Sequence, residues 1–269
     1  MMKKIIIITV WGMMSVLSLY AQTERDIICK ENYRTLFGGE ALTGEGTDPE
    51  LMDILQKFIF GEVFRTGELD MKQRELITCV CLASMQTLPQ LEAHAGAALN
   101  VGATPVELRE AIYQCSPFIG FPRVLNAIGT VNKVFQSRGI SLPLEPQGTV
   151  SEKDRRTEGA KMQAYLYGNE IKKYMDTLPQ DMNDTVKNFL TEMYFGDFYT
   201  RKGLEVKARE LLSLCVLATI GAEKQLATQV TGCLKAGHSK EVLYAAMIQC
   251  LPYIGFPNAL TAIAIIKDA

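Results

Sequence analysis

Apolar residues recur at helical spacing through most of this chain, and little of it alternates with the period of two that marks a strand. Asp48-Pro49 supplies a cap and a first-turn proline for a helix that runs through about Phe64. Asp70 is placed to cap a second helix, which extends to about Met85. The pattern therefore predicts an all-α fold in which sheet is absent or minor.

Three further helices complete this part of the chain. Pro89 opens a third helix, which Gly102 closes. The stretch 104–107, TPVE, has the spacing of a capping box ahead of a fourth helix, which Pro117 interrupts. A fifth helix is predicted over 122–138.

The same pattern occurs twice, at an offset of 135 residues, the separation of Gly102 from Gly237. GATPVELREAIYQCSPFIGFPRVLNAI, from Gly102, aligns without gaps to GHSKEVLYAAMIQCLPYIGFPNALTAI, from Gly237. RELITCVCLAS at Arg74 is likewise paired with RELLSLCVLAT at Arg209. Each copy is too long to be one unit of a solenoid, so we predict two fused copies of one helical domain.

The first residues, MMKKIIIITVWGMMSVLSLYA, have the layout of a secretory signal peptide, with lysines before an apolar run. Cleavage is expected after about Ala21, and no later apolar run reaches the ~18–20 residues that a membrane span needs. We therefore expect an exported, periplasmic or secreted protein without a membrane span. The predicted domains are 1–21 (signal peptide), 22–140 (first helical domain, bearing the site), 141–159 (linker) and 160–269 (second, degenerate helical domain).

Charge and composition limit the classes of partner and cofactor that we expect. Loss of Lys3 and Lys4 from the 28 basic residues leaves 26 against 30 acidic ones, and no basic block is interleaved with aromatic residues, so nucleic acid is not an expected partner. Most of the seven cysteines lie in apolar helical runs, where cysteine packs as a small hydrophobe. The two histidines, His94 and His238, hold non-equivalent positions in the two copies. We expect neither a metal nor another cofactor.

FGEV, RELITxxxLA, HxxAALNVGAT and QCxPxxGFPRVLNAI follow one another in the first copy and recur in degenerate form in the second. This set of motifs resembles the carboxymuconolactone decarboxylase family, which includes the alkylhydroperoxidase-D-like proteins, over most of the mature chain. The resemblance implies all-helical domains that assemble as oligomers, with sites at helix and subunit junctions. Because members with one such domain are typically hexamers, it also implies that this fused pair forms a trimer.

The resemblance points to particular polar residues. Alkylhydroperoxidase-D-like members carry a glutamate, a Cys-x-x-Cys pair and a histidine; Glu75 and His94 match the outer two, but Thr87 and Gln90 stand at the cysteine positions. Without two thiols the usual peroxidase cycle cannot close. The decarboxylases lack those cysteines and keep the histidine, in a context resembling DELRMH. Here the context is PQLEAH, with Gln90 in place of a glutamate and Glu92 nearby.

His94 is the first predicted catalytic residue, because an imidazole can exchange a proton with a carbon acid; the alternative is a hydrogen-bonded packing residue. Glu75 is the second. Its alternative role is an ion pair, for example with Arg74, because the second copy keeps Glu210 although Gln229 replaces the histidine. A rise of ~1.5 Å per residue offsets Glu75 and His94 by roughly 9 Å along antiparallel helices, so direct contact is not expected, although a substrate or water could bridge them.

Three more residues are predicted to bind substrate. Gln90 and Glu92 lie near His94 in sequence, and Arg123 can pair bidentately with a carboxylate, although a structural role is an alternative for it. Cys79 is an alternative thiol, one turn after Glu75. Loss of the histidine from the second copy predicts one site per chain.

Three functions stay open at this point. The first is an exported enzyme that resembles carboxymuconolactone decarboxylase and uses proton transfer on a small carboxylated or lactone-like substrate. The second is a peroxiredoxin-like thiol peroxidase that uses Cys79. The third is an oligomeric protein that binds a small molecule in an apolar pocket without turning it over.

Overall fold

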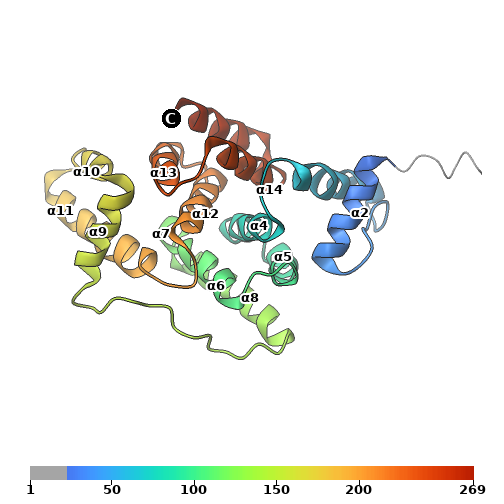
Figure 1. The fold of residues 1–269 in the computed structure, drawn as a ribbon, viewed down its shortest axis with the longest axis horizontal. Helices are drawn as coiled ribbons and strands as arrows, with labels where there is room; N and C mark the ends of the chain where they lie inside the picture. The colour runs from blue at the N-terminus through green and yellow to red at the C-terminus, as the bar shows by residue number, and fades with distance from the viewer. Residues whose placement is uncertain (1–22) are drawn as a thin grey trace, which may run out of the picture. The chain divides into compact units, whose positions relative to one another are not determined.

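The computed structural model describes residues 23–269, apart from the side chains at 174, 180 and 181, and every regular element in that range is helical (Figure 1). The predicted all-α fold is confirmed. The predicted signal peptide, 1–21, lies outside the described residues. The chain forms two compact units, one ending at Arg65 and one beginning at Thr66, which are described separately.

The first unit contains a helix that changes its winding along its length. Its elements are α2 (Glu24–Phe37), α3 (Pro49–Gln56), the π-helical segment η1 (Lys57–Glu62) and the 3₁₀ turn η2 (Val63–Arg65). The sequence predicted one helix where α3, η1 and η2 follow one another. Asp48 makes no capping hydrogen bond, although Pro49 begins α3 as expected. The π-helical segment η1 packs closely against α2 at Gly61. A Cβ at this position would lie 2.6 Å from the carbonyl oxygen of Arg25 on α2.

The second unit holds the rest of both repeats. From the first repeat come α4 (Met71–Met85), α5 (Leu88–Asn100), α6 (Pro105–Gln114), α7 (Ser116–Ile119) and α8 (Phe121–Ser137). From the second come α9 (Arg155–Tyr167), α10 (Glu170–Met175), α11 (Gln180–Phe189), the π-helical segment η3 (Leu190–Tyr199), α12 (Val206–Thr219), α13 (Glu223–Lys235) and α14 (Lys240–Asp268). The predicted capping box is present at Thr104 with Glu107, and the predicted cap at Asp70 proves to be a capping box with Gln73.

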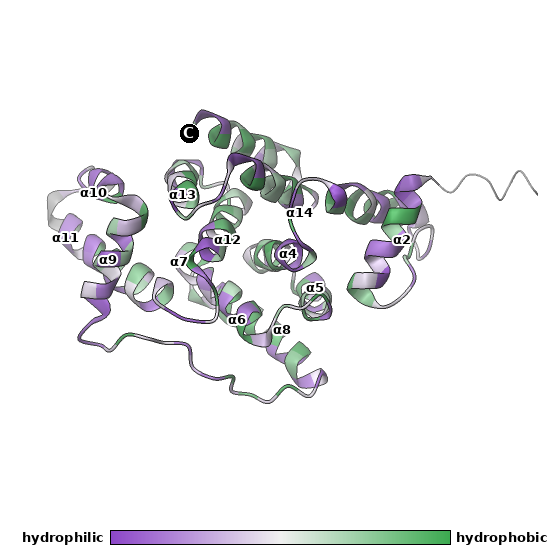
Figure 2. Cartoon of the chain, in the orientation of Figure 1, coloured by the Kyte–Doolittle hydropathy of each residue, from purple (hydrophilic) through white to green (hydrophobic). Residues whose placement is uncertain are grey.

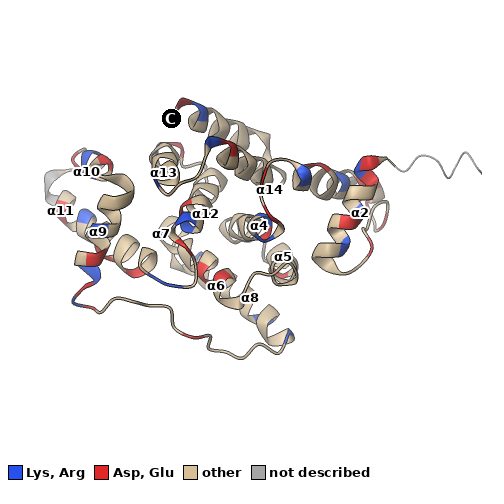
Figure 3. Cartoon of the chain, viewed as in Figure 1, with Lys and Arg blue, Asp and Glu red and all other residues tan. Residues whose placement is uncertain are grey.

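The core of this unit is shared between the repeats. α4 and α12 occupy equivalent places in the two copies and pack against each other, and α14 packs against both (Figure 1). Figure 2 shows the hydrophobic character of α4 and α14 in this region. In Figure 3 the charged residues of α4 and α12 lie near one end of each helix, and the remainder is uncharged. One cluster of buried side chains therefore draws on both copies.

Because the core crosses from one copy to the other, the compact units differ from the predicted division into 22–140, a linker at 141–159 and 160–269. Those boundaries follow the sequence repeat. The chain between α8 and α9 contains no helix over 139–150, and the core-forming helices lie on both sides of it. The repeat is thus a unit of sequence, whereas the buried core is a joint product of two repeats.

Two buried arginines join the repeats in the same way. The Arg74 guanidinium donates to Gln249 Oε1 of the other repeat at 3.1 Å, and to the carbonyl oxygens of Thr66 and Gly67. Gln249 Nε2 in turn donates to Thr78 Oγ1 at 3.2 Å. The glutamine therefore holds the start of α4 against α14.

The reciprocal contacts are present at the equivalent positions. Arg209 Nη1 donates to Gln114 Oε1 at 3.1 Å, and Gln114 Nε2 donates to Ser213 Oγ at 3.3 Å. Arg209 also meets Glu110 Oε2 at 3.2 Å. These contacts give the Arg-Glu-Leu and Gln-Cys sequences a structural reason to occur in both copies.

α14 is the one described helix that is long and apolar enough, by length and composition, to cross a membrane. Sequence analysis found no such run, because Pro252, Gly255 and Pro257 interrupt this one. Gly255 has φ 78° and ψ 163°, so α14 is two helices joined at a kink. A core helix passes the same test of length and composition, and α14 packs against α4, α12 and α13. The absence of a membrane span stays a prediction.

Candidate active site

His94 and Glu75 form a buried pair between α5 and α4. His94 Nδ1 lies 2.8 Å from Glu75 Oε2, Glu75 is fully buried, and His94 is 9% exposed. The expected separation along the helix axes, with a bridging substrate or water, is wrong for this pair. That estimate counted only the rise along two antiparallel helices and left out the reach of the two side chains, which meet directly between α4 and α5.

The Glu75 carboxylate meets His94 instead of serving as an ion-pair partner of Arg74. The Arg74 side chain is occupied by Gln249 and by backbone carbonyl oxygens, including that of Leu69. The remaining Glu75 oxygen, Oε1, is buried and has no hydrogen-bond partner among residues 23–269. Buried polar atoms are rarely left in this condition outside sites that receive a ligand or water.

Tyr253, from α14 of the second repeat, completes the site. Its ring lies edge-on to the His94 ring, with centroids 5.9 Å apart and an interplanar angle of 88°. Its hydroxyl is buried and, within the described part of the chain, has no hydrogen-bond partner. Burial, followed by the nearby Glu75 charge, raises the pKa of Tyr253 well above its usual value, against the smaller opposing effect of the neighbouring Thr78 side chain. The phenol therefore stays protonated and is available as a donor.

Sequence analysis missed Tyr253. The repeat offset carried a signal, because Tyr253 corresponds to Phe118 in the other copy. The Tyr253 hydroxyl thus lies beside the histidine, whereas Phe118, beside Gln229, has no hydroxyl.

The pair can set the protonation of the imidazole. When Glu75 is ionised, Nδ1–H donates to its carboxylate, which leaves Nε2 as the nitrogen that carries the lone pair. The same carboxylate stabilises the imidazolium that forms when Nε2 takes up a proton. Glu75 Oε1 and the Tyr253 hydroxyl add an acceptor and a donor nearby. Together these atoms can exchange a proton and hold polar atoms of a substrate.

The three residues predicted to bind substrate lie on the surface of the chain. Gln90 is exposed one turn before His94, on the same face of α5, whereas Glu92 is exposed on a different face. Arg123 is exposed on α8, and its backbone carbonyl accepts a hydrogen bond from Gln86 Nε2. No hydrogen bond or ion pair recorded within 23–269 joins Gln90, Glu92 or Arg123 to the His94–Glu75 pair. Their role stays a prediction, and Gln90 has the most suitable placement.

The cysteines are buried thiols. Cys79 is fully buried, and burial raises the pKa of its thiol well above the usual value, with the Glu75 charge adding to the effect. Cys81 Sγ lies 3.5 Å from Cys250 Sγ, and all seven cysteines are free and buried. Because a reactive cysteine must be an accessible thiolate, this environment disfavours thiol chemistry at Cys79. Among the described residues no cluster of three or more histidine, cysteine, aspartate or glutamate side chains could hold a metal ion.

The second repeat repeats the geometry with different chemistry. Gln229, in place of His94, donates from Nε2 to Glu210 Oε2 at 2.7 Å, and Tyr167 donates to the same oxygen at 2.8 Å. Burial raises the pKa of the Glu210 carboxyl to about 7, against the opposing effect of hydrogen bonds from Tyr199 and Tyr167. The Gln229 amide cannot act as an acid or a base near neutral pH, so this copy lacks the imidazole and keeps only the buried Glu210 carboxyl of the pair.

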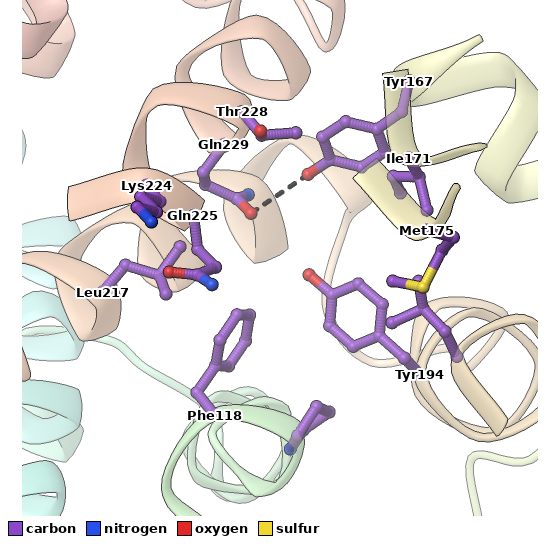
Figure 4. A pocket seen from close by; sticks show the side chains of 12 residues that line it. Phe118, Tyr167, Ile171, Met175, Tyr194, Leu217, Lys224, Gln225, Thr228 and Gln229 are labelled. Carbon is purple, nitrogen blue, oxygen red and sulfur yellow. Dashed lines mark hydrogen bonds between the residues drawn. The ribbon is translucent and has the colours of Figure 1, made fainter. Parts of the chain in front are cut away.

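A cavity of about 210 Å³ opens beside Gln229. Figure 4 shows Tyr167 and Tyr194 along one side of it, with Leu217, Lys224 and Gln225 opposite and Phe118 between them. Phe118 comes from the first repeat, so this cavity also depends on both copies.

The sequence model of the carboxymuconolactone decarboxylase family matches this chain twice, over residues 49–133 and 184–268. The chain belongs to the carboxymuconolactone decarboxylase family. The two matches confirm the tandem arrangement, and the matched ranges include both Glu75 with His94 and Glu210 with Gln229.

Individual relatives of this carboxymuconolactone decarboxylase family protein are distant. The 4-carboxymuconolactone decarboxylase of Acinetobacter baylyi is 23% identical over 120 residues, which cover 44% of this chain and 89% of that protein. The nitrosuccinic acid decarboxylase of Metarhizium robertsii is 28% identical over 81 residues, which cover 30% of this chain and only 57% of that protein.

The fold also has a solved counterpart. A structure from Burkholderia xenovorans, provisionally named as a gamma-carboxymuconolactone decarboxylase subunit, matches 92% of this chain and 98% of its own, with a TM-score of 0.50 and 19% identity. At this identity the likeness supports the fold alone.

Proposed function

We propose that this protein is an exported decarboxylase that acts by proton transfer on a small carboxylated or lactone-like substrate. The observation that carries the proposal is the buried 2.8 Å contact between His94 Nδ1 and Glu75 Oε2. A carboxylate that fixes the tautomer of a histidine is a recurrent arrangement for acid–base catalysis. The names of two relatives, both decarboxylases, support the same class of reaction.

The proposed reaction needs one proton at carbon. When the bond to the carboxylate carbon breaks, carbon dioxide leaves and the electron pair stays on the substrate, delocalised into a conjugated carbonyl group as an enolate or, in nitrosuccinate, into the nitro group as a nitronate. His94, protonated at Nε2, delivers its proton to that carbon, and Glu75 stabilises the imidazolium before the transfer. The Tyr253 hydroxyl donates a hydrogen bond to the enolate oxygen. Solvent then restores the proton on His94.

Carbon dioxide release from 4-carboxymuconolactone and from nitrosuccinate, the acids named for the relatives, tests this proposal. His94→Gln should lower kcat by about 100-fold or more, since a positioned general acid contributes about that much. His238→Gln is the matched control, because His238 is also buried but bonds the Lys207 carbonyl in the second repeat. Circular dichroism checks that both variants fold. Full turnover in His94→Gln would contradict the proposal.

The thiol peroxidase alternative has less support, because Cys79 is buried and its thiol pKa is raised. Hydroperoxide consumption that disappears in Cys79→Ser but persists in His94→Gln would reinstate it. The binding-protein alternative is supported by the cavity beside Gln229 and does not exclude catalysis at His94.

We also propose that the protein is a homotrimer. Large apolar side chains are exposed at equivalent places in the two repeats: Phe121 and Leu125 on α8, and Phe256 and Leu260 on α14, each between 53% and 68% exposed. Exposed apolar residues that gather in this way favour an interface between subunits. The proposed export depends on the leader pattern in residues 1–21.

A further inference from the structure

We propose that the cavity beside Gln229 is a second site, which binds a monocyclic aromatic carboxylic acid without converting it. The proposal rests on the cavity in the second repeat and does not depend on catalysis at His94. Its three parts are the size of the cavity, its aromatic walls and the charge at its rim.

The cavity has the size and lining of a site for one ring. An apolar cavity of about 150 Å³ holds benzene, so a volume of about 210 Å³ leaves room for a ring and a small substituent. Phe118, Tyr167 and Tyr194 face this space from three different helical segments (Figure 4). Aromatic rings pack edge-on or offset against one another, which suits a flat unsaturated ligand better than a bulky aliphatic one.

The rim supplies a positive charge. Lys224 and Gln225 are exposed at the start of α13 and line the cavity on the side opposite the tyrosines (Figure 4). None of the ion pairs in the described chain uses Lys224, and no carboxylate lines the cavity. A carboxylate on the ring can therefore meet the Lys224 ammonium while the ring enters the apolar part.

The side chains at the inner end of the cavity can hold a ligand but cannot convert it. Gln229 is committed to Glu210 Oε2 through Nε2, and Tyr167 donates to the same oxygen. Both donors meet the same Glu210 oxygen, the carboxyl group is fully buried and does not line the cavity, and the amide that replaces histidine cannot act as a base. A ligand here meets hydrogen-bonding groups without a proton-transfer group.

Isothermal titration of the full chain with benzoate tests the charge. Benzoate should bind saturably, and Lys224→Gln should weaken it by about fivefold, the effect of one exposed ion pair. Neutral benzyl alcohol should be unaffected by the change. Lys235→Gln, an exposed lysine on the same helix that does not line the cavity, should bind benzoate like the parent. An equal affinity of the parent and Lys224→Gln for benzoate would overturn the assignment of the carboxylate.

A second pair of variants tests whether benzoate binds in the cavity beside Gln229. Thr228→Phe puts a ring into the cavity and should abolish benzoate binding, whereas Thr231→Phe, on the same helix but outside this cavity, should retain it. Thermal unfolding checks that both proteins fold. His94→Gln should bind benzoate like the parent, which separates this site from the proposed catalytic one. Absence of binding to the parent, or unchanged binding to a folded Thr228→Phe, would overturn the proposal.

Discussion

Tyr253 and Glu75 each place one polar atom in the buried site without a hydrogen-bond partner among the described residues, and Glu210 Oε1 of the other repeat is in the same condition. In a purely structural pair these atoms would cost stability, since an unsatisfied buried polar group costs about 1–3 kcal/mol. Their presence next to His94 fits a site that satisfies them when a substrate is bound. The opposite repeat has phenylalanine at the Tyr253 position, so a ring alone suffices for packing there.

Tyr253→Phe should therefore lower kcat with little loss of stability. The hydroxyl is proposed to bond the enolate, and loss of one such donor costs about 100-fold in rate. Carbon dioxide release and thermal unfolding measure the two effects. Phe118→Tyr, at the equivalent position in the other repeat, is the control and should leave kcat unchanged. An unchanged kcat in Tyr253→Phe would remove the tyrosine from the mechanism.

Glu210 should make the stability of the protein depend on pH. Its pKa is about 7 in the folded chain, against 4.5 as the ordinary value for a glutamate. Between these values the folded state keeps a proton that the unfolded state has lost, so the free energy of unfolding falls as pH rises from about 5 to 8. Below pH 4.5 both states are protonated and the contribution is complete.

Thermal unfolding across this pH range checks the prediction for Glu210. Glu210→Gln keeps an acceptor for Gln229 and Tyr167 but cannot ionise, so its melting temperature should fall less than that of the parent. Glu223→Gln, an exposed change on α13, should fall as the parent does. An identical pH profile for the parent and Glu210→Gln would contradict this account.

At the scale of helices, caps and prolines in the sequence predicted most of the points at which helices begin. The cap at Asp70, the capping box at Thr104 and the proline starts were predicted correctly, because each depends on residues within one turn. The change to π and 3₁₀ winding after α3 was not predicted, because it accompanies close packing against α2. The direct bond between Glu75 and His94 was missed for a related reason, since it depends on how two helices cross.

Tyr253 marks the limit of that reasoning. It reaches His94 from the other repeat, and no spacing along the chain encodes such a contact. The repeat offset could have pointed to it, through the exchange of tyrosine for phenylalanine. Glu75 and His94 themselves came from the family resemblance, and the structure then brought them together.

The link between helices of different repeats has a measurable strength. Gln249→Leu removes the acceptor of one Arg74 hydrogen bond and the donor to Thr78 Oγ1, both in the buried core. The free energy of unfolding should fall by about 2–3 kcal/mol. Urea denaturation measures it, with Gln136→Leu, an exposed position on α8, as a near-neutral control. A loss below about 0.5 kcal/mol would show that water replaces the glutamine without cost.

For the whole molecule, the apolar side chains on α8 and α14 predict an oligomer. Leu125→Glu combined with Leu260→Glu places charges in the proposed interface and should convert a trimer to monomers, since buried unpaired charge opposes association. Light scattering after size-exclusion chromatography gives the mass. Lys133→Glu, exposed on α8, should leave the trimer intact. A monomeric parent protein would contradict the proposed assembly.

The shared core of α4, α12 and α14 also has a consequence for how such a chain can arise. A polypeptide with one copy keeps α5, α6 and α8 against α4 but lacks α12 and α14, so equivalent helices must come from a second molecule, and folding then depends on concentration. Joining two copies end to end makes that encounter intramolecular and frees it from dilution. Once the two repeats are joined, their equivalent sites need no longer be identical, and one can keep histidine while the other has glutamine.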